Sequence, residues 1–146
     1  MGTVASILRS KPDQTVQTIS PSATMREALE RMARHNIGAL LVMEGEQIVG
    51  IVTERDYARK CVLMGRKSRE TAVSDLMTSP VMYVGPDETN EHCMALMTEN
   101  RLRHLPVLDQ GRLVGLVSIG DLVKDIISEQ QFVIKQLEHY IAGGHG

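Results

Sequence analysis

Two seven-residue stretches of the same type, 65 residues apart, constrain most strongly what this chain can fold into. Residues 50–56 read Gly-Ile-Val-Thr-Glu-Arg-Asp, and residues 115–121 read Gly-Leu-Val-Ser-Ile-Gly-Asp. Each consists of a glycine, two aliphatic residues, a hydroxyl residue, two variable positions and an aspartate. A pattern that recurs at a fixed offset indicates a structural unit that is built twice.

The match continues on both sides of these stretches at the same offset. Pro21 aligns with Pro86 and Thr24 with Thr89, and the apolar positions between them keep their class. We therefore expect two copies of a unit of about 60 residues, too small to bury enough apolar surface alone, which should pack their apolar faces on each other.

Composition and charge exclude one broad class of function. Hydrophobic residues make up 42% of the 146 residues, enough for a core, but aromatic residues make up only 3% and there is no Trp. The aromatic platforms that stack single-stranded bases are therefore missing. Sixteen Lys and Arg against eighteen Asp and Glu leave no basic field, so we expect no nucleic-acid partner.

The cysteines and the hydropathy pattern indicate the compartment. Cys61 and Cys93 do not form a Cys-x-x-Cys motif, and Cys93 takes the repeat position of Ala28, so both are predicted to be buried small hydrophobes. No apolar run approaches the ~18 residues of a membrane span. The first residues also lack the apolar core of a signal peptide. We expect a cytoplasmic protein with no membrane partner.

Periodicity predicts the order strand, helix, strand, strand, helix in each copy. In the first copy we expect an edge strand at 15–19, a helix capped at Thr24, a hairpin of strands 39–43 and 48–52, and a helix over 54–64. A small helix within residues 1–14 should pack on the core, and residues 66–75 should be a polar linker.

The second copy repeats this order and then departs from it. We expect a strand at 81–84, a helix capped at Thr89, a hairpin of strands 105–108 and 113–117, and a last helix after Ser118. The predicted divisions are residues 1–75 for the first repeat with its extension and linker, 76–128 for the second repeat, and 129–146 for a C-terminal helix extension and tail.

The last helix carries an apolar stripe that outlasts its repeat. Its residues are Ile126, Ile127, Val133, Ile134, Leu137 and Ile141. The stripe indicates either a surface for a partner or docking on the first repeat, and the pattern alone does not choose between them.

With these elements in place, the chain resembles the tandem CBS-domain pair, named for cystathionine β-synthase, over residues 12–128. The resemblance rests on the doubled heptapeptide, the openings Pro21 to Thr24 and Pro86 to Thr89, and the run Arg103-His104-Leu105-Pro106-Val107. It implies an α+β fold of two β-α-β-β-α repeats packed about a pseudo-two-fold axis, here with an extended C-terminal helix. It also implies clefts between the repeats that bind AMP, ATP or NAD(H), and assembly into a homodimer.

The chemistry of the motif partly supports that expectation. Thr53 and Ser118 stand where a strand becomes a helix, and the free N–H groups and dipole of a helix start favour an anion. Asp56 and Asp121 can accept both hydrogens of a ribose diol. A capping box predicts the same residues without any ligand, so both interpretations stay open.

The phosphates of a nucleotide need cations, and the two copies differ here. The resemblance implies that Arg103 and His104 contact phosphates, crossing between the repeats, and Arg55 is a third candidate in the first copy. No His or Cys shares a metal-ligand spacing with His104, so no metal is expected. The candidate ligand-binding residues are Thr18, Ile19, Pro21, Ile37, Gly38, Ala39, Thr53, Arg55, Asp56, Val84, Arg103, His104, Leu105, Pro106, Ser118, Ile119, Gly120 and Asp121.

The expected function is a stand-alone, non-enzymatic regulatory module that binds an adenine nucleotide and signals by a change of conformation or assembly to an unknown downstream protein. No nucleophile with a base, no carboxylate pair and no metal constellation indicates an enzyme. The sequence is also compatible with a structural interaction module whose sites are vestigial, and with a sensor for S-adenosylmethionine or a divalent metal.

Overall fold

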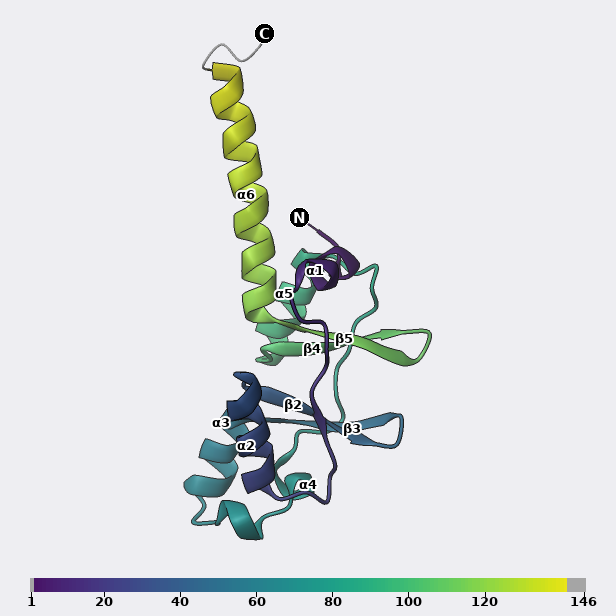
Figure 1. The fold of residues 1–146 in the computed structure, drawn as a ribbon, viewed down its shortest axis with the longest axis vertical. Helices are drawn as coiled ribbons and strands as arrows, with labels where there is room; N and C mark the ends of the chain where they lie inside the picture. Colours follow the sequence, from purple (N-terminus) through teal and green to yellow (C-terminus); the bar gives the residue numbers. More distant parts are fainter. Residues whose placement is uncertain (1, 142–146) are drawn as a thin grey trace. The chain divides into compact units, whose positions relative to one another are not determined.

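The computed structural model describes residues 2–141 (Figure 1), so the part of the predicted tail beyond residue 141 lies outside the described residues. In chain order the elements are α1 (Val4–Ser10), β1 (Thr18–Ile19), α2 (Met25–His35), β2 (Ala39–Glu44), β3 (Gln47–Thr53), α3 (Glu54–Asp56), the π-helix η1 (Tyr57–Val62), the 3-10 helix η2 (Ser68–Glu70), α4 (Val73–Leu76), α5 (Asn90–Asn100), β4 (His104–Asp109), β5 (Arg112–Ser118) and α6 (Ile119–Ile141).

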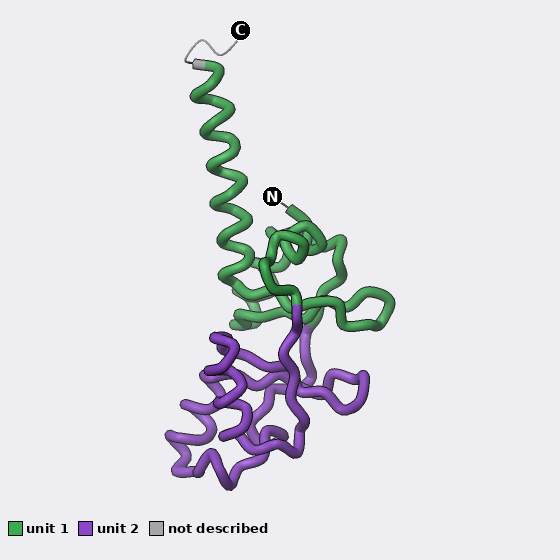
Figure 2. The backbone as a smooth tube through the Cα atoms, viewed as in Figure 1, with its two compact units in different colours: residues 1–14, 83–146 green, residues 15–82 purple. Residues whose placement is uncertain are grey.

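The chain forms two compact units, coloured separately in Figure 2. One contains residues 15–82, and the other contains residues 1–14 together with 83–146. Both are α+β, with a β-hairpin as the central element. These two units do not coincide with the divisions predicted from the sequence at residues 75 and 128, because α1 packs with the second repeat. The predicted division of the chain into domains stays a prediction.

The hairpins confirm the predicted register of the repeats. Ala39 pairs with Thr53 in the first hairpin, and His104 pairs with Ser118 in the second, 65 residues later in each strand. β1 lies parallel to β2 at the edge of a three-stranded sheet, as expected from residues 15–19, although only Thr18 and Ile19 are paired. The first four residues of β2 are buried, as is typical of a strand with a continuous apolar run.

The helices that precede the hairpins begin at the predicted caps. The Thr24 side chain accepts a hydrogen bond from the Glu27 backbone N–H at 3.2 Å, and the Thr89 side chain accepts one from His92 N–H at 3.1 Å. Apolar side chains at helical spacing, Cys93 among them, then enter the cores. Cys61 and Cys93 are both buried, as predicted. Burial raises the pKa of the Cys93 thiol to about 11, with a further contribution from Glu88.

Two sequence predictions are wrong. Residues 81–84 do not form a strand: only Val84 is bridged, in parallel, to Val107. Pro80 just before this run has no N–H and so cannot donate to a ladder. The predicted polar linker 66–75 also contains order, since η2 lies within it and α4 begins there. Val73 and Leu76 are fully buried in the core of the first unit, and the charges of residues 66–70 hid this short apolar pair.

The two short helices α1 and α4 play the same part in the two units. The Val4 N–H donates to Glu88 O at 2.8 Å, and the Val73 N–H donates to Ala23 O at 2.8 Å. Bonds from Ala5 to Pro86 and from Ser74 to Pro21, at 2.9 and 3.0 Å, repeat the correspondence one residue later. The short helices therefore match at an offset of 69 residues, whereas the repeats match at 65. Each repeat therefore packs against a short helix whose position in the sequence does not follow the 65-residue offset of the heptapeptides.

The motif glycines are where these helices meet the hairpins. A Cβ atom on Gly50 would lie 2.5 Å from Met77 Sδ, just after α4, and one on Gly115 would lie 2.7 Å from both Cδ atoms of Leu8 in α1. Such distances are far below van der Waals contact. The glycine that opens each heptapeptide therefore leaves room for an apolar side chain, Met77 or Leu8, which would have to move if the glycine carried a Cβ atom.

We expect Gly115→Ala to destabilise the protein by about 1–3 kcal/mol, the usual cost of overpacking. In a Leu8→Ala background the same change should cost much less, because the clash partner is gone. Urea unfolding of the four proteins in this double-mutant cycle measures the coupling. Gly85→Ala is the matched control, since its Cβ would meet only Leu108 O at 3.9 Å. A cycle with no coupling would contradict the packing role.

Candidate ligand-binding site

In the first repeat, the heptapeptide ends in a reciprocal pair of hydrogen bonds. The Asp56 N–H donates to Thr53 Oγ1 at 3.1 Å, and the Thr53 N–H donates to Asp56 Oδ2 at 2.9 Å. Asp56 is only 8% exposed. This is a complete capping box at the start of α3, so the capping interpretation of the motif is realised.

The second repeat reproduces this geometry. The Ser118 N–H donates to Asp121 Oδ2 at 2.8 Å, and the Asp121 N–H donates to Ser118 Oγ at 3.1 Å. The box stands at the start of α6, the 23-residue helix. The two carboxylates are thus held in the same orientation at the first turn of a helix in each repeat.

A lysine pairs with each of these carboxylates, which sequence reasoning did not predict. Lys60 Nζ lies 3.0 Å from Asp56 Oδ1, and it also donates to Leu76 O at 3.1 Å. Lys11 Nζ lies 2.9 Å from Asp121 Oδ2 and donates to Leu116 O at 2.9 Å. A capping box needs no cation, so the lysines are a feature beyond capping. Lys60 stands four residues after Asp56, a helical spacing from which this ion pair could have been predicted. Lys11 is 110 residues from Asp121, so no local pattern in the sequence indicates that pair.

Arg103 and His104 lie beside the second carboxylate. The Ile119 N–H donates to Arg103 O at 2.9 Å, and His104 is paired with Ser118 across the hairpin. The structure thus brings Arg103, His104, Ser118, Ile119 and Asp121 together at the start of α6, within one unit.

The His104 side chain is uncharged at neutral pH. Burial lowers its pKa below the ordinary value. Asp121 opposes this shift, and the positive charges of Lys11 and Arg103 add to it. The imidazole can therefore donate or accept a hydrogen bond, while Lys11 and Arg103 supply the positive charge at this position.

The equivalent position in the first repeat has different chemistry. The Glu54 N–H donates to Gly38 O at 3.1 Å, and Ala39 pairs with Thr53, so the backbone is arranged as in the second repeat. Gly38 and Ala39 take the places of Arg103 and His104, and Glu54 takes the place of Ile119. The carboxylate of Glu54 thus stands where the second repeat has an apolar side chain.

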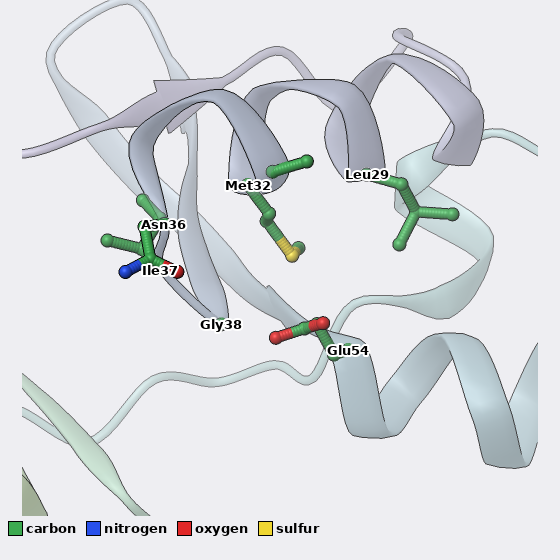
Figure 3. A pocket seen from close by; sticks show the side chains of 7 residues that line it. Leu29, Met32, Asn36, Ile37, Gly38 and Glu54 are labelled. Carbon is green, nitrogen blue, oxygen red and sulfur yellow. The ribbon is translucent and has the colours of Figure 1, made fainter.

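A cavity of about 220 Å³ opens beside Glu54 in the first unit (Figure 3). Its lining residues are Leu29, Met32, Ala33, Asn36, Ile37, Gly38 and Glu54. The side chains of Met32 and Glu54 point toward each other across it in Figure 3. Two predicted residues, Ile37 and Gly38, therefore line a cavity that contains one carboxylate and whose exposed surface is mainly polar.

The remaining predicted residues are placed by their backbones or lie exposed. Thr18 O accepts a hydrogen bond from Arg31 Nη1, and Pro21 O accepts one from Ser74 N–H at 3.0 Å. Val84 donates to Pro106 O at 3.0 Å and accepts from Leu108 at 2.9 Å, and its side chain is buried, as is that of Leu105. Ile19 is also buried, whereas Arg55 and Gly120 are exposed on the first turns of α3 and α6.

The described residues contain neither a candidate metal-ligand group nor a helix suited to cross a membrane. Within residues 2–141, no three His, Cys, Asp or Glu side chains are grouped so that they could hold a metal ion. In the same part of the chain, no helix has the length and hydropathy needed to cross a membrane.

Comparison with known proteins identifies the class. The family model described as "CBS domain" matches residues 4–62 and 73–128, so the chain belongs to the CBS-domain family and carries the domain twice. A mitochondrial CBS domain-containing protein of Arabidopsis thaliana, CBSX3, is 38% identical over 151 residues, covering 98% of this chain and 73% of the plant protein.

Solved structures agree with this assignment. A signal-transduction protein with CBS domains from Burkholderia ambifaria, described as putative, is 55% identical, with a TM-score of 0.86 over 88% of this chain and 96% of that one. The CBS domain pair of protein MJ0100, solved with 5′-methylthioadenosine and S-adenosyl-L-methionine, is 28% identical, with a TM-score of 0.73 over 88% of this chain and 98% of that one. The predicted fold, two CBS repeats followed by a long C-terminal helix, is confirmed.

His104 should make the stability of the protein depend on pH. Because its pKa in the folded chain lies below the unfolded value of about 6.5, the unfolded chain binds more protons in the window between the two values. The stabilisation is present above that window and is lost as the pH falls through it. Urea unfolding at several pH values should therefore show a shallower loss on acidification for His104→Gln than for wild type. His35→Gln, at an exposed histidine, is the control, and equal slopes for all three proteins would refute the assignment.

Proposed function

We propose that the protein is a regulatory module that binds a phosphorylated adenosine ligand, AMP, ATP or NAD(H), at the second repeat. The observation that carries this proposal is the grouping of Lys11, Arg103 and His104 around Asp121 at the start of α6. The prediction that the ligand lies in a cleft between the repeats stays a prediction, as do the cytoplasmic location, the homodimer and the unknown downstream protein.

The groups in this cluster match the parts of a nucleotide. Asp121 Oδ2 already accepts from Ser118 and Lys11, so we assign its other oxygen to a ribose hydroxyl. Lys11 and Arg103 supply positive charge for a phosphate, and the dipole at the start of α6 favours the same anion. A capping box alone would need neither cation.

The first repeat suits a different adenosine ligand. Glu54, which lines the cavity of this repeat, provides a negative charge without a neighbouring Arg103 equivalent. This arrangement favours an uncharged or cationic adenosyl compound over a phosphorylated one. The related CBS pair solved with methylthioadenosine and S-adenosylmethionine supports this second candidate ligand class for the first repeat. S-adenosylmethionine is therefore a candidate ligand for that repeat only.

A purely structural module and an enzyme receive less support. A structural module explains the capping boxes and the lysine that pairs with each buried carboxylate, but not why the second repeat adds Arg103 and His104 beside it. An enzyme is not supported either: the relatives described above are named for CBS domains and signal transduction, and no catalytic domain is named among them.

Regulation requires that the ligand favour one state of the protein. A tenfold preference for one state supplies only about 1.4 kcal/mol, so the output element must be closely linked to the site. α6 meets this condition, because Ser118 and Asp121 form the capping box at its start. We therefore assign the output to α6.

The proposed function is tested by thermal unfolding with AMP, ATP, NAD, NADH, adenosine and S-adenosylmethionine. A ligand at a hundred times its dissociation constant adds roughly 2.7 kcal/mol, a shift of several degrees at this size. We expect a phosphorylated ligand to raise the melting temperature of the wild type and of Asp56→Asn, and to raise that of Asp121→Asn much less.

Each shift is measured against the variant's own ligand-free melting temperature, because Asp121→Asn also weakens the capping box. Asp75→Ala, at an exposed aspartate, is the control and should respond like wild type. The proposal fails if no phosphorylated ligand shifts the wild type, or if Asp121→Asn keeps the full shift.

Lys11 should distinguish phosphorylated ligands from adenosine itself. A charge-assisted hydrogen bond is worth about 1.5–3 kcal/mol, so Lys11→Met should weaken binding of the phosphorylated ligand roughly tenfold or more. Adenosine, which has no phosphate, should bind the variant as well as wild type, or better, because Lys11 no longer competes for Asp121.

Lys60→Met is the matched control for this experiment, because it removes the equivalent ion pair in the first repeat. It should leave the affinity of the second repeat for phosphate unchanged. Isothermal titration calorimetry of the three proteins gives the comparison, and equal losses for adenosine and the phosphorylated ligand would exclude a phosphate contact by Lys11.

A further inference from the structure

α6 extends beyond the domain that it terminates. The second CBS match ends at residue 128, whereas α6 continues to residue 141, and Figure 1 shows its later turns reaching well past the other elements of its unit. Every side chain from residue 131 to residue 140 is exposed. These turns include Phe132, Val133, Ile134, Leu137 and Tyr140, each 49–72% exposed. Apolar side chains of this size are seldom left in water over several consecutive turns.

The apolar residues of α6 follow a period of seven. Three series of positions seven residues apart lie on one face: Val123, Gln130 and Leu137; Ile126, Val133 and Tyr140; Ile127 and Ile134. We call these eight residues the α6 stripe. At 100° per residue, Phe132 falls on the opposite side of the helix. A seven-residue period belongs to helices that wind around one another, because a straight helix of 3.6 residues per turn drifts away from it.

We propose that the α6 stripe binds the α6 stripe of a second copy of this chain, forming a helix-to-helix coiled coil. A helix with the same period fits a seven-residue stripe, and this chain supplies one on every copy. The stripe begins within the CBS domain and continues through its extension without a break, so the interface would be continuous with the folded unit.

The available area is sufficient for a specific contact. The exposed members of the stripe, apart from Gln130, are 42–72% exposed, and the stripe from Val123 to Tyr140 spans about 27 Å of helix. Covering such a stripe on two copies removes roughly 1,000 Å² from water, the lower bound for a specific interface. A coiled coil of this length has only marginal stability when it is isolated. Pairing is favoured here because each helix is already formed and attached to a folded unit.

The charges on α6 are compatible with self-association. Lys124 and Lys135 alternate along the helix with Glu129 and Glu138, so neither direction of pairing opposes two blocks of like charge. Gln130 is the one polar member of the stripe, and it lies at its middle. A single polar residue at such a position fixes the register of a coiled coil at some cost in stability.

The oligomeric state of the full chain tests this inference independently of any nucleotide. Sedimentation equilibrium across a wide range of concentration should show a dimer for wild type. Leu137→Glu places a charge in the contact on both copies and should raise the dissociation constant more than about a hundredfold. Phe132→Glu is the matched control, a large exposed apolar residue on the opposite face, and should leave the dimer intact.

Circular dichroism establishes that both variants keep their helix content, as expected for side chains that are 55% and 63% exposed in the isolated chain. A second measurement uses Gln130→Leu, which should raise the melting temperature and make it rise further with concentration. A monomeric wild type overturns the proposal. So does a dimer that survives Leu137→Glu, or one that is lost equally in both glutamate variants.

Discussion

The packing of each repeat depends on one apolar side chain from a segment that does not follow the 65-residue offset: Met77 in the first repeat and Leu8 in the second. The core face of each hairpin is covered by the repeat's own helix together with α1 or α4, and a glycine in each hairpin is placed where Leu8 or Met77 packs against it. Burial at these two points fixes where β3 and β5 lie, and therefore where the helices that follow them begin. This packing therefore also sets the positions of the capping boxes and of the carboxylates in them.

Two repeats with the same backbone thereby present different chemistry. Backbone bonds at Gly38 and Arg103 correspond residue for residue, yet one repeat has a carboxylate beside its site and the other has two cations and a histidine. Even the shared lysine reaches its aspartate from unrelated positions, one helical turn away in one repeat and from the N-terminal segment in the other. A largely buried carboxylate is costly without a positive partner, so each repeat has acquired one by a different route. The difference between the repeats lies in side chains that the fold leaves free to vary.

The predictable part of the structure is the part whose cause is local in sequence. The hairpins, Thr24 and Thr89 as helix caps, and the capping boxes at Thr53 and Ser118 could all be predicted, because each rests on residues within a few positions of one another. The pairing of Lys11 with Asp121 could not, since it depends on α1 returning to the second repeat across 110 residues. The offset of 69 residues between α1 and α4 also hid their equivalence from a comparison made at 65. The buried Val73 and Leu76 were missed for a related reason, because two apolar residues after a charged run carry no periodicity of their own.

The proposed ligand site and the proposed self-association surface lie on the same helix, and that has a thermodynamic consequence. The first turns of α6 are held firmly: Leu122 is fully buried, Asn90 donates to Leu122 O and to Asp125 Oδ2 at 2.9 Å each, and the Gly2 N–H donates to the same Asp125 oxygen at 3.0 Å. A helix anchored in this way moves as a rigid rod rather than by bending near its start. Any change that a ligand makes in the direction of the Asp121 turn is then carried to Leu137, about four turns away. If assembly favours one direction of α6, ligand binding and assembly must influence each other by the same factor, because coupling between two binding equilibria is reciprocal. The extension beyond residue 128 would in this way convert occupancy of a small site into a change in the number of chains in the assembly.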